Sequence, residues 1–122
     1  MRSVLERVKE ITRIVGTIDV KIIKLVDVKI AIDNPETGSF KLRAIIDQKF
    51  FIDIYEFLLK GKVIRYSYAL IKENKSVLRY DNAPHHLELR TYPHHKHVEN
   101  ELFPLENPSL SAFISEVKKF LD

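Results

Sequence analysis

The sequence predicts an α+β fold, in which an antiparallel meander sheet of about five strands is combined with an N-terminal and a C-terminal helix. Apolar residues recur every three or four positions near both ends of the chain, which is the period of a helix. Between about residues 18 and 80 they alternate with polar residues instead, and short turns separate the alternating stretches. Because each of these elements has one apolar face to bury, we expect a single domain over residues 1–122.

The two terminal helices are predicted from their apolar faces and their end signals. The first is expected over residues 2–15, with Gly16 as its stop. The second is expected to begin with Asn107 as the N-cap and Pro108 at the first helical position. Its apolar face consists of Leu110, Phe113, Ile114, Val117 and Leu121.

The strands are predicted from alternation and from turn chemistry. The first begins with Ile18, Val20 and Ile22, and a slip of phase near residues 23–25 indicates a bulge. Proline and glycine within residues 34–38 predict a tight turn. The remaining strands are expected at residues 40–46, 50–58, 63–72 and 77–80. Residues 81–106 have no sustained period and contain three prolines, so we predict an ordered functional connection that packs against the sheet.

Composition limits the classes of function. The chain has no cysteine, which excludes disulfides, thiolate zinc sites and cysteine nucleophiles. No segment approaches the roughly 18 uninterrupted apolar residues of a membrane helix, and the N-terminus lacks an apolar signal core, so we expect a soluble cytoplasmic protein. The net charge of +3 favours polyanionic partners such as RNA. The single glutamine, Gln48, favours a thermophilic source.

All five histidines lie within residues 85–97. Cleavage of RNA through its 2′-hydroxyl needs a base, an acid and a cation for the phosphorane, and histidine can exchange protons near neutral pH. The expected catalytic set is His85, His86, His94, His95 and His97, with Asp81 orienting an imidazole. The expected substrate-binding set is Arg65, Arg79 and Lys96 for phosphate, Tyr80 and Tyr92 for bases, and Asn82 beside them.

The charges of this segment predict how it responds to pH. Between residues 79 and 99, three basic and three acidic side chains cancel, so the segment becomes positive only when its histidines are protonated. Phosphate binding should therefore strengthen as the pH falls. Adjacent histidines such as His94 and His95 should also point to opposite sides of an extended chain, so the five cannot all share one cleft.

Other interpretations of the same segment remain open. The set His85, His94, His95 and His97 could join Asp81 or Glu99 around a divalent cation, but the spacing matches no established metal motif, and we predict no metal or cofactor. The segment could also grip RNA or a protein partner without catalysis. Individual histidines could simply bridge the loop to the sheet, and Asp81 and Asn82 could form only a turn before Pro84.

Two runs, Arg79-Tyr-Asp-Asn-Ala-Pro-His-His86 and Tyr92-Pro-His-His-Lys-His97, resemble the TumE-type toxin family of type II toxin–antitoxin systems. The preceding strand Arg65-Tyr-Ser-Tyr68 is similar too, and the resemblance covers about residues 62–100. Leu87 departs from the family pattern, in which a proline commonly follows the first histidine pair. The resemblance implies a growth-inhibiting toxin that acts on RNA and a cognate antitoxin with a helix-turn-helix domain. Long strands rich in isoleucine and valine also leave an edge that could pair with a second copy.

Overall fold

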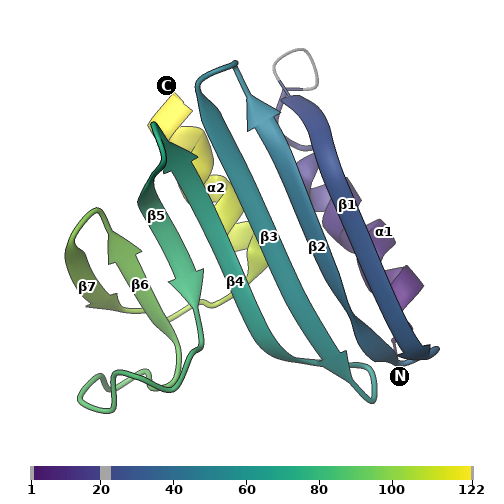
Figure 1. The fold of residues 1–122 in the computed structure, drawn as a ribbon. Coiled ribbons are helices and arrows are strands. Elements are labelled where there is room, and N and C mark those ends of the chain that lie inside the picture. Colours follow the sequence, from purple (N-terminus) through teal and green to yellow (C-terminus); the bar gives the residue numbers. More distant parts are fainter. Residues whose placement is uncertain (1, 20–22, 122) are drawn as a thin grey trace.

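The computed structural model describes residues 2–19 and 23–121 of the chain. It contains a seven-stranded antiparallel sheet in the order of the sequence, with both helices on one face (Figure 1). The strands are β1 (Ile23–Asn34), β2 (Thr37–Ile46), β3 (Phe50–Leu59), β4 (Lys62–Lys72), β5 (Lys75–Asp81), β6 (His95–Val98) and β7 (Glu101–Pro104). The helices are α1 (Val4–Val15) and α2 (Leu110–Leu121). The α+β class and the meander are confirmed, whereas the expected number of strands was too small.

The two additional strands, β6 and β7, lie in the segment that was predicted to be a connection. They are four residues each, and Val98 pairs with Glu101 across a tight turn in which Glu99 has a positive φ of 54°. Strands of only four residues give no sustained alternation. They form because β5 offers an edge, on which Tyr80 pairs with Lys96.

The ends of the helices differ in how well they were predicted. Gly16 follows α1 as its C-cap, as expected. The helix begins at Val4 instead of residue 2, because Ser3 caps it through a reciprocal capping box with Glu6 that was not predicted. The second helix begins later than predicted, at Leu110 rather than after Asn107. The reason is that Ser109 provides the cap, since its Oγ accepts a hydrogen bond from the backbone N–H of Ala112 at 3.0 Å.

The first strand, β1, forms an edge of the sheet. The predicted tight turn joins it to β2, and its bulge lies between Leu25 and Asp27, slightly after the expected position. The prediction that Ile18 begins the first strand is wrong, because Ile18 is buried in the turn after α1, where its backbone N–H donates to the carbonyl of Val15. The predicted strand residues Val20 and Ile22 lie outside the described residues. Almost all of β1 is exposed, and the exposed large apolar residues on it are Leu25, Val26, Val28, Ile30 and Ile32.

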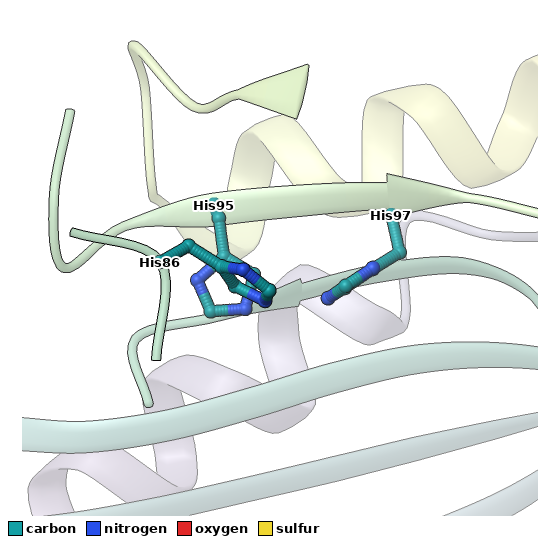
Figure 2. A group of neighbouring side chains, drawn as sticks. All are labelled: His86, His95 and His97. Carbon is teal, nitrogen blue, oxygen red and sulfur yellow. The ribbon is translucent and has the colours of Figure 1, made fainter. Parts of the chain in front are cut away.

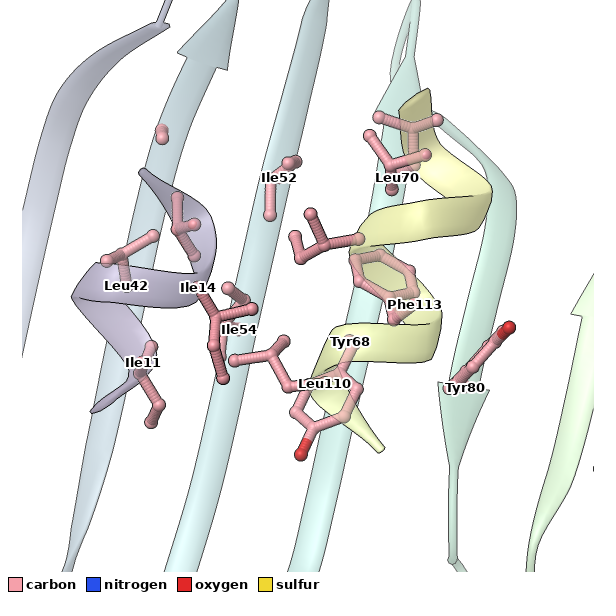
Figure 3. Close-up of a cluster of buried hydrophobic side chains, with 14 of the residues drawn as sticks. Ile11, Ile14, Leu42, Ile52, Ile54, Tyr68, Leu70, Tyr80, Leu110 and Phe113 are labelled. Carbon is pink, nitrogen blue, oxygen red and sulfur yellow. The ribbon is translucent and has the colours of Figure 1, made fainter. Parts of the chain in front are cut away.

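The hydrophobic core lies between the helices and the sheet (Figure 3). Ile11 and Ile14 of α1 pack beside β2 and β3, and Leu110 and Phe113 of α2 pack over β4 and β5. The opposite face of the sheet carries neither helix, and alternation therefore sends every second side chain of the strands to an open surface.

A buried polar network fastens α1 to the centre of the sheet. Glu56 on β3 is fully buried and receives hydrogen bonds from Nε and Nη2 of Arg7 at 2.7 and 2.6 Å. The Tyr68 hydroxyl donates to the same carboxylate at 2.5 Å. Burial alone would lower the pKa of Arg7, but its hydrogen bonds to Glu56 and their mutual attraction outweigh this effect and raise the pKa. The guanidinium of Arg7 therefore keeps its charge where it contacts the carboxyl group of Glu56.

Replacement of Glu56 with Gln should destabilise the protein by about 3–5 kcal/mol, because Arg7 would keep a buried charge without its counterion. Urea denaturation monitored by circular dichroism measures this change. The control is Asp53→Asn, which breaks the more exposed pair with Arg43 and should cost less than about 1 kcal/mol. Equal losses in the two variants would contradict the assigned role of the network.

Candidate functional site

A cleft of about 350 Å³ opens on the face of the sheet that carries no helix. Strand β4 contributes Arg65 and Ser67, and the remaining residues come from β5, β6 and the loop between them. The lining residues are Arg65, Ser67, Arg79, Asp81, Ala83, His85, His86, His95 and His97. Seven of these nine residues belong to the predicted site.

Strand register explains why these side chains meet. Asp81 on β5 pairs with Ser67 on β4 and with His95 on β6. Two residues along the same strands, Arg79 on β5 pairs with His97 on β6. Directly paired residues of adjacent strands point to the same face, and so do residues two positions apart on one strand. The sheet therefore presents both acid–base and cationic groups on the same surface.

Three imidazole rings converge in this cleft (Figure 2). His95 and His97 extend from β6, and His86 reaches them from the loop after β5. The ring centroids of His86 and His95 are 4.7 Å apart, those of His95 and His97 are 5.0 Å apart, and those of His86 and His97 are 5.7 Å apart. Two of the three rings remain half-buried, whereas His95 is only 2% exposed.

His95 is held by an oxygen atom at each ring nitrogen. Its Nδ1 lies 3.0 Å from the carbonyl oxygen of Pro93, and its Nε2 lies 2.9 Å from Oδ1 of Asp81. A carbonyl and a carboxylate only accept hydrogen bonds, so this arrangement is satisfied by a doubly protonated ring. It is also satisfied when Nδ1 donates to Pro93 and Nε2 binds a cation shared with Asp81.

Asp81 connects several parts of the site. Besides contacting His95, its Oδ1 accepts a hydrogen bond from the backbone N–H of Ala83 at 2.9 Å, so the predicted side-chain turn is present. Its Oδ2 lies 3.6 Å from Nε of Arg79. The carboxylate thus fixes the exit of the loop, one imidazole and one guanidinium together.

The surroundings of His97 favour its neutral form. Burial lowers its pKa, and repulsion by His95 and Arg79 lowers it further, although attraction by Asp81 acts in the opposite direction. At neutral pH this ring is therefore able to accept a proton. No carboxylate within the described residues pairs with Arg65, which leaves its guanidinium available at the mouth of the cleft.

Three residues of the predicted site lie on the opposite face of the sheet. The Tyr80 hydroxyl donates to Glu116 of α2, and Lys96 Nζ lies 3.3 Å from the same carboxylate. Nδ1 of His94 lies 2.8 Å from the Tyr66 hydroxyl, in the layer between sheet and helices. These contacts connect the site to the core instead of lining the cleft, and they show the expected division of His94 from His95.

Asn82 and Tyr92 of the predicted site do not line the cleft. The Asn82 amide accepts from the backbone N–H of Tyr66 and donates to the carbonyl of Ile64, both at 3.0 Å. It thereby continues the pairing of β4 beyond the end of β5. Tyr92 is exposed on the loop, directly before Pro93.

Three contributors were outside the predicted site. Ala83 lines the cleft and donates its backbone N–H to Asp81. The Pro93 carbonyl orients His95, and Ser67 lies beside Asp81 on the floor of the cleft. The serine could be found from its position two residues after Arg65 on the same strand face. The carbonyl carries no sequence signal, because any residue type supplies one.

The same three histidines have the geometry to hold a divalent cation. One ligand nitrogen from each of His86, His95 and His97 lies within 4.8 Å of the others. Three imidazoles with an open position are a familiar zinc environment, and the contact from Nδ1 of His95 to a carbonyl is the usual outer contact of a metal-binding histidine.

The sequence matches the family model described as Toxin TumE over residues 12–121, which is nearly the whole chain. No curated protein and no solved structure matches it. Among the described residues, no helix is long and apolar enough to cross a membrane.

The free energy of unfolding should fall as the pH is lowered from 6.5 to 5. Burial lowers the pKa of His94, and repulsion by His95 adds to this, so the unfolded chain takes up a proton at a higher pH than the folded chain does. The stabilising contribution is complete above the ordinary histidine pKa of about 6.5 and is lost as the pH falls through the folded value. Urea denaturation at several pH values tests this prediction. His94→Asn should show a shallower decline, and an identical decline in the variant would count against it.

Proposed function

Because the chain belongs to the TumE toxin family, we propose that it is the toxin of a type II toxin–antitoxin pair and that it acts as a metal-independent endoribonuclease. The supporting observation is the cleft, which brings His86, His95 and His97 together with two arginines. Such a site has both the proton-transfer groups and the cations that cleavage at a phosphodiester needs.

The lowered pKa of His97 suggests its role. A neutral imidazole can remove the proton from the 2′-hydroxyl, whose oxygen then attacks the adjacent phosphorus. His86, whose ring centroid lies 5.7 Å from that of His97, would protonate the departing 5′-oxygen. Arg79 and Arg65 would stabilise the charge that develops on the phosphorane oxygens. The expected products are a 2′,3′-cyclic phosphate and a 5′-hydroxyl.

The nearly inaccessible His95 would serve as a positioning residue. Asp81 and Pro93 fix its ring, so its position next to His86 and His97 does not depend on substrate. When both nitrogens carry protons, the ring adds a positive charge to the floor of the cleft. Asp81 also offsets part of that charge, which keeps the site from becoming uniformly cationic.

Membership in a toxin family suggests an antitoxin partner. We propose a cognate antitoxin with a helix-turn-helix domain, which inhibits the toxin through an acidic segment laid over the basic cleft. We propose that the toxin acts on its RNA substrate in the cytoplasm. The exposed apolar edge of β1 leaves room for a homodimer.

A second candidate is a metal-dependent form of the same site. The observation that favours it is the mutual approach of three histidine nitrogens to within 4.8 Å, with His95 oriented by a carbonyl. A cation held there would act as a Lewis acid toward the phosphate.

Replacement of either His97 or His86 with Ala should slow RNA cleavage by about 100- to 10,000-fold, because each change removes one proton-transfer group. Purified protein and labelled RNA resolved on gels measure the rates, and mass spectrometry identifies the RNA ends. The control is His94→Ala, which removes the same kind of side chain from the opposite face and should retain cleavage.

Parallel reactions with EDTA separate the two candidates. Cleavage that persists in EDTA supports the metal-independent mechanism. Cleavage that is lost in EDTA and restored by Zn²⁺ or Mn²⁺ supports the second candidate. RNA binding without cleavage under any of these conditions would overturn both and favour a non-catalytic binding module.

A further inference from the structure

The open face of the sheet carries a second feature beside the cleft. A trough of about 400 Å³ crosses β1 to β4 and is lined by Asp27, Lys29, Lys41, Leu42, Arg43, Asp53, Ile54, Tyr55 and Ser67. Ser67 also lines the histidine cleft, so the trough and the cleft meet at this residue. The proposed catalytic mechanism uses none of the trough outside this junction.

Strand register places one row of side chains from the edge of the sheet to the cleft. Each member is the direct partner of the next across adjacent strands, from Lys29 to Lys41, Tyr55, Ser67, Asp81 and His95. Adjacent strands are about 4.8 Å apart, so Tyr55 lies roughly 10 Å from Asp81 across the sheet. At that distance, an extended RNA strand bound in the cleft could place a nearby nucleotide on Tyr55.

The basic side chains in the trough differ in whether a carboxylate lies close to them. Arg43 is neutralised by Asp53, with two hydrogen bonds of 2.6 Å. Lys29 lies 3.9 Å from Asp27. Lys41 has no carboxylate partner among the described residues, and its Nζ lies 5.8 Å from the centroid of the Tyr55 ring. A lysine without a carboxylate partner in this part of the chain therefore lies over an aromatic ring that is only half-buried.

An aromatic ring next to a free cation on an open sheet fits single-stranded nucleic acid. Rings of this kind stack on unpaired bases, and lysine contacts the adjacent phosphate. A duplex would fit poorly, because its bases are stacked on one another and cannot reach the sheet. The direct link to the cleft indicates RNA that passes through the site on its way across the sheet.

We propose that the trough is the binding track for the single-stranded RNA beside the scissile bond, with a base stacked on Tyr55 and a phosphate at Lys41. This proposal rests on the function proposed for the cleft. The substrate is then unstructured RNA several nucleotides long, and the cleft alone engages only the nucleotides that flank the cut.

Binding of a mixed-sequence 12-nucleotide RNA tests the track directly. The probe carries 2′-O-methyl groups, which prevent cleavage, and fluorescence anisotropy gives Kd. Tyr55→Leu should weaken binding by roughly 5- to 100-fold, whereas Tyr55→Phe, which keeps the ring, should bind like the wild type. Lys41→Gln should also weaken binding and reduce the slope of log Kd against log salt by about one. The control Lys118→Gln lies in the last turn of α2 and should change neither value.

Cleavage of long and short substrates distinguishes failure of the track from failure of the catalytic site. Tyr55→Leu should raise KM for a 12-nucleotide RNA and leave cleavage of a dinucleotide unchanged, while His97→Ala should slow cleavage of both by about 100- to 10,000-fold. If Tyr55→Leu weakens binding but His97→Ala cleaves as fast as the wild type, the track stands and the catalytic assignment falls. Unchanged affinity in both Tyr55→Leu and Lys41→Gln would overturn the track, as would equal affinity of the wild type for a 12-base-pair duplex. Matching thermal unfolding curves confirm that the variants are folded.

Discussion

The buried contact between Arg7 and Glu56 supports the surface on which the site is built. It anchors α1 beneath β3, and the Tyr68 hydroxyl brings β4 into the same network. Strand β4 in turn supplies Ser67 to the floor of the cleft and receives the Asn82 amide at its backbone. A buried pair of this kind contributes less to net stability than to a defined arrangement, because desolvation cancels much of its attraction. In this chain the arrangement it defines is that of the strands under the histidines.

The site is formed by two structural contributions of different kinds. Strands β5 and β6 hold Asp81, His95 and His97 by ladder register, and the loop between these strands brings His86 to them. The loop is tied at its start by Asp81 and Asn82 and near its end by Thr91, whose hydroxyl donates to the carbonyl of His94. The geometry of the three rings therefore depends on backbone contacts at both ends of the loop.

Much of the fold was predictable because helix and strand periods were long and regular. The strands β6 and β7 were not, since four-residue strands carrying histidine, lysine and glutamate give too little alternation, and only the edge of β5 makes them pair. The residue types of the cleft were predictable from composition, whereas their division between two faces needed the exact strand phase around residue 95. The pairing of Tyr55 with Lys41 could not be predicted from the sequence, for a different reason. The role proposed for this pair depends on the strand register across three hairpins, and a single sequence does not reveal that register.

The alternation of side chains along β2 to β5 has a consequence for how this protein can change over evolutionary time. One set of positions faces the helices and determines whether the chain folds, and the residues between them face the open surface, where the proposed cleavage site and RNA track lie. Substitutions in the second set can alter ligand preference while the packing beneath them is preserved. Selection for a new target and selection for a stable fold therefore act on interleaved residues of the same strands, with little conflict between them.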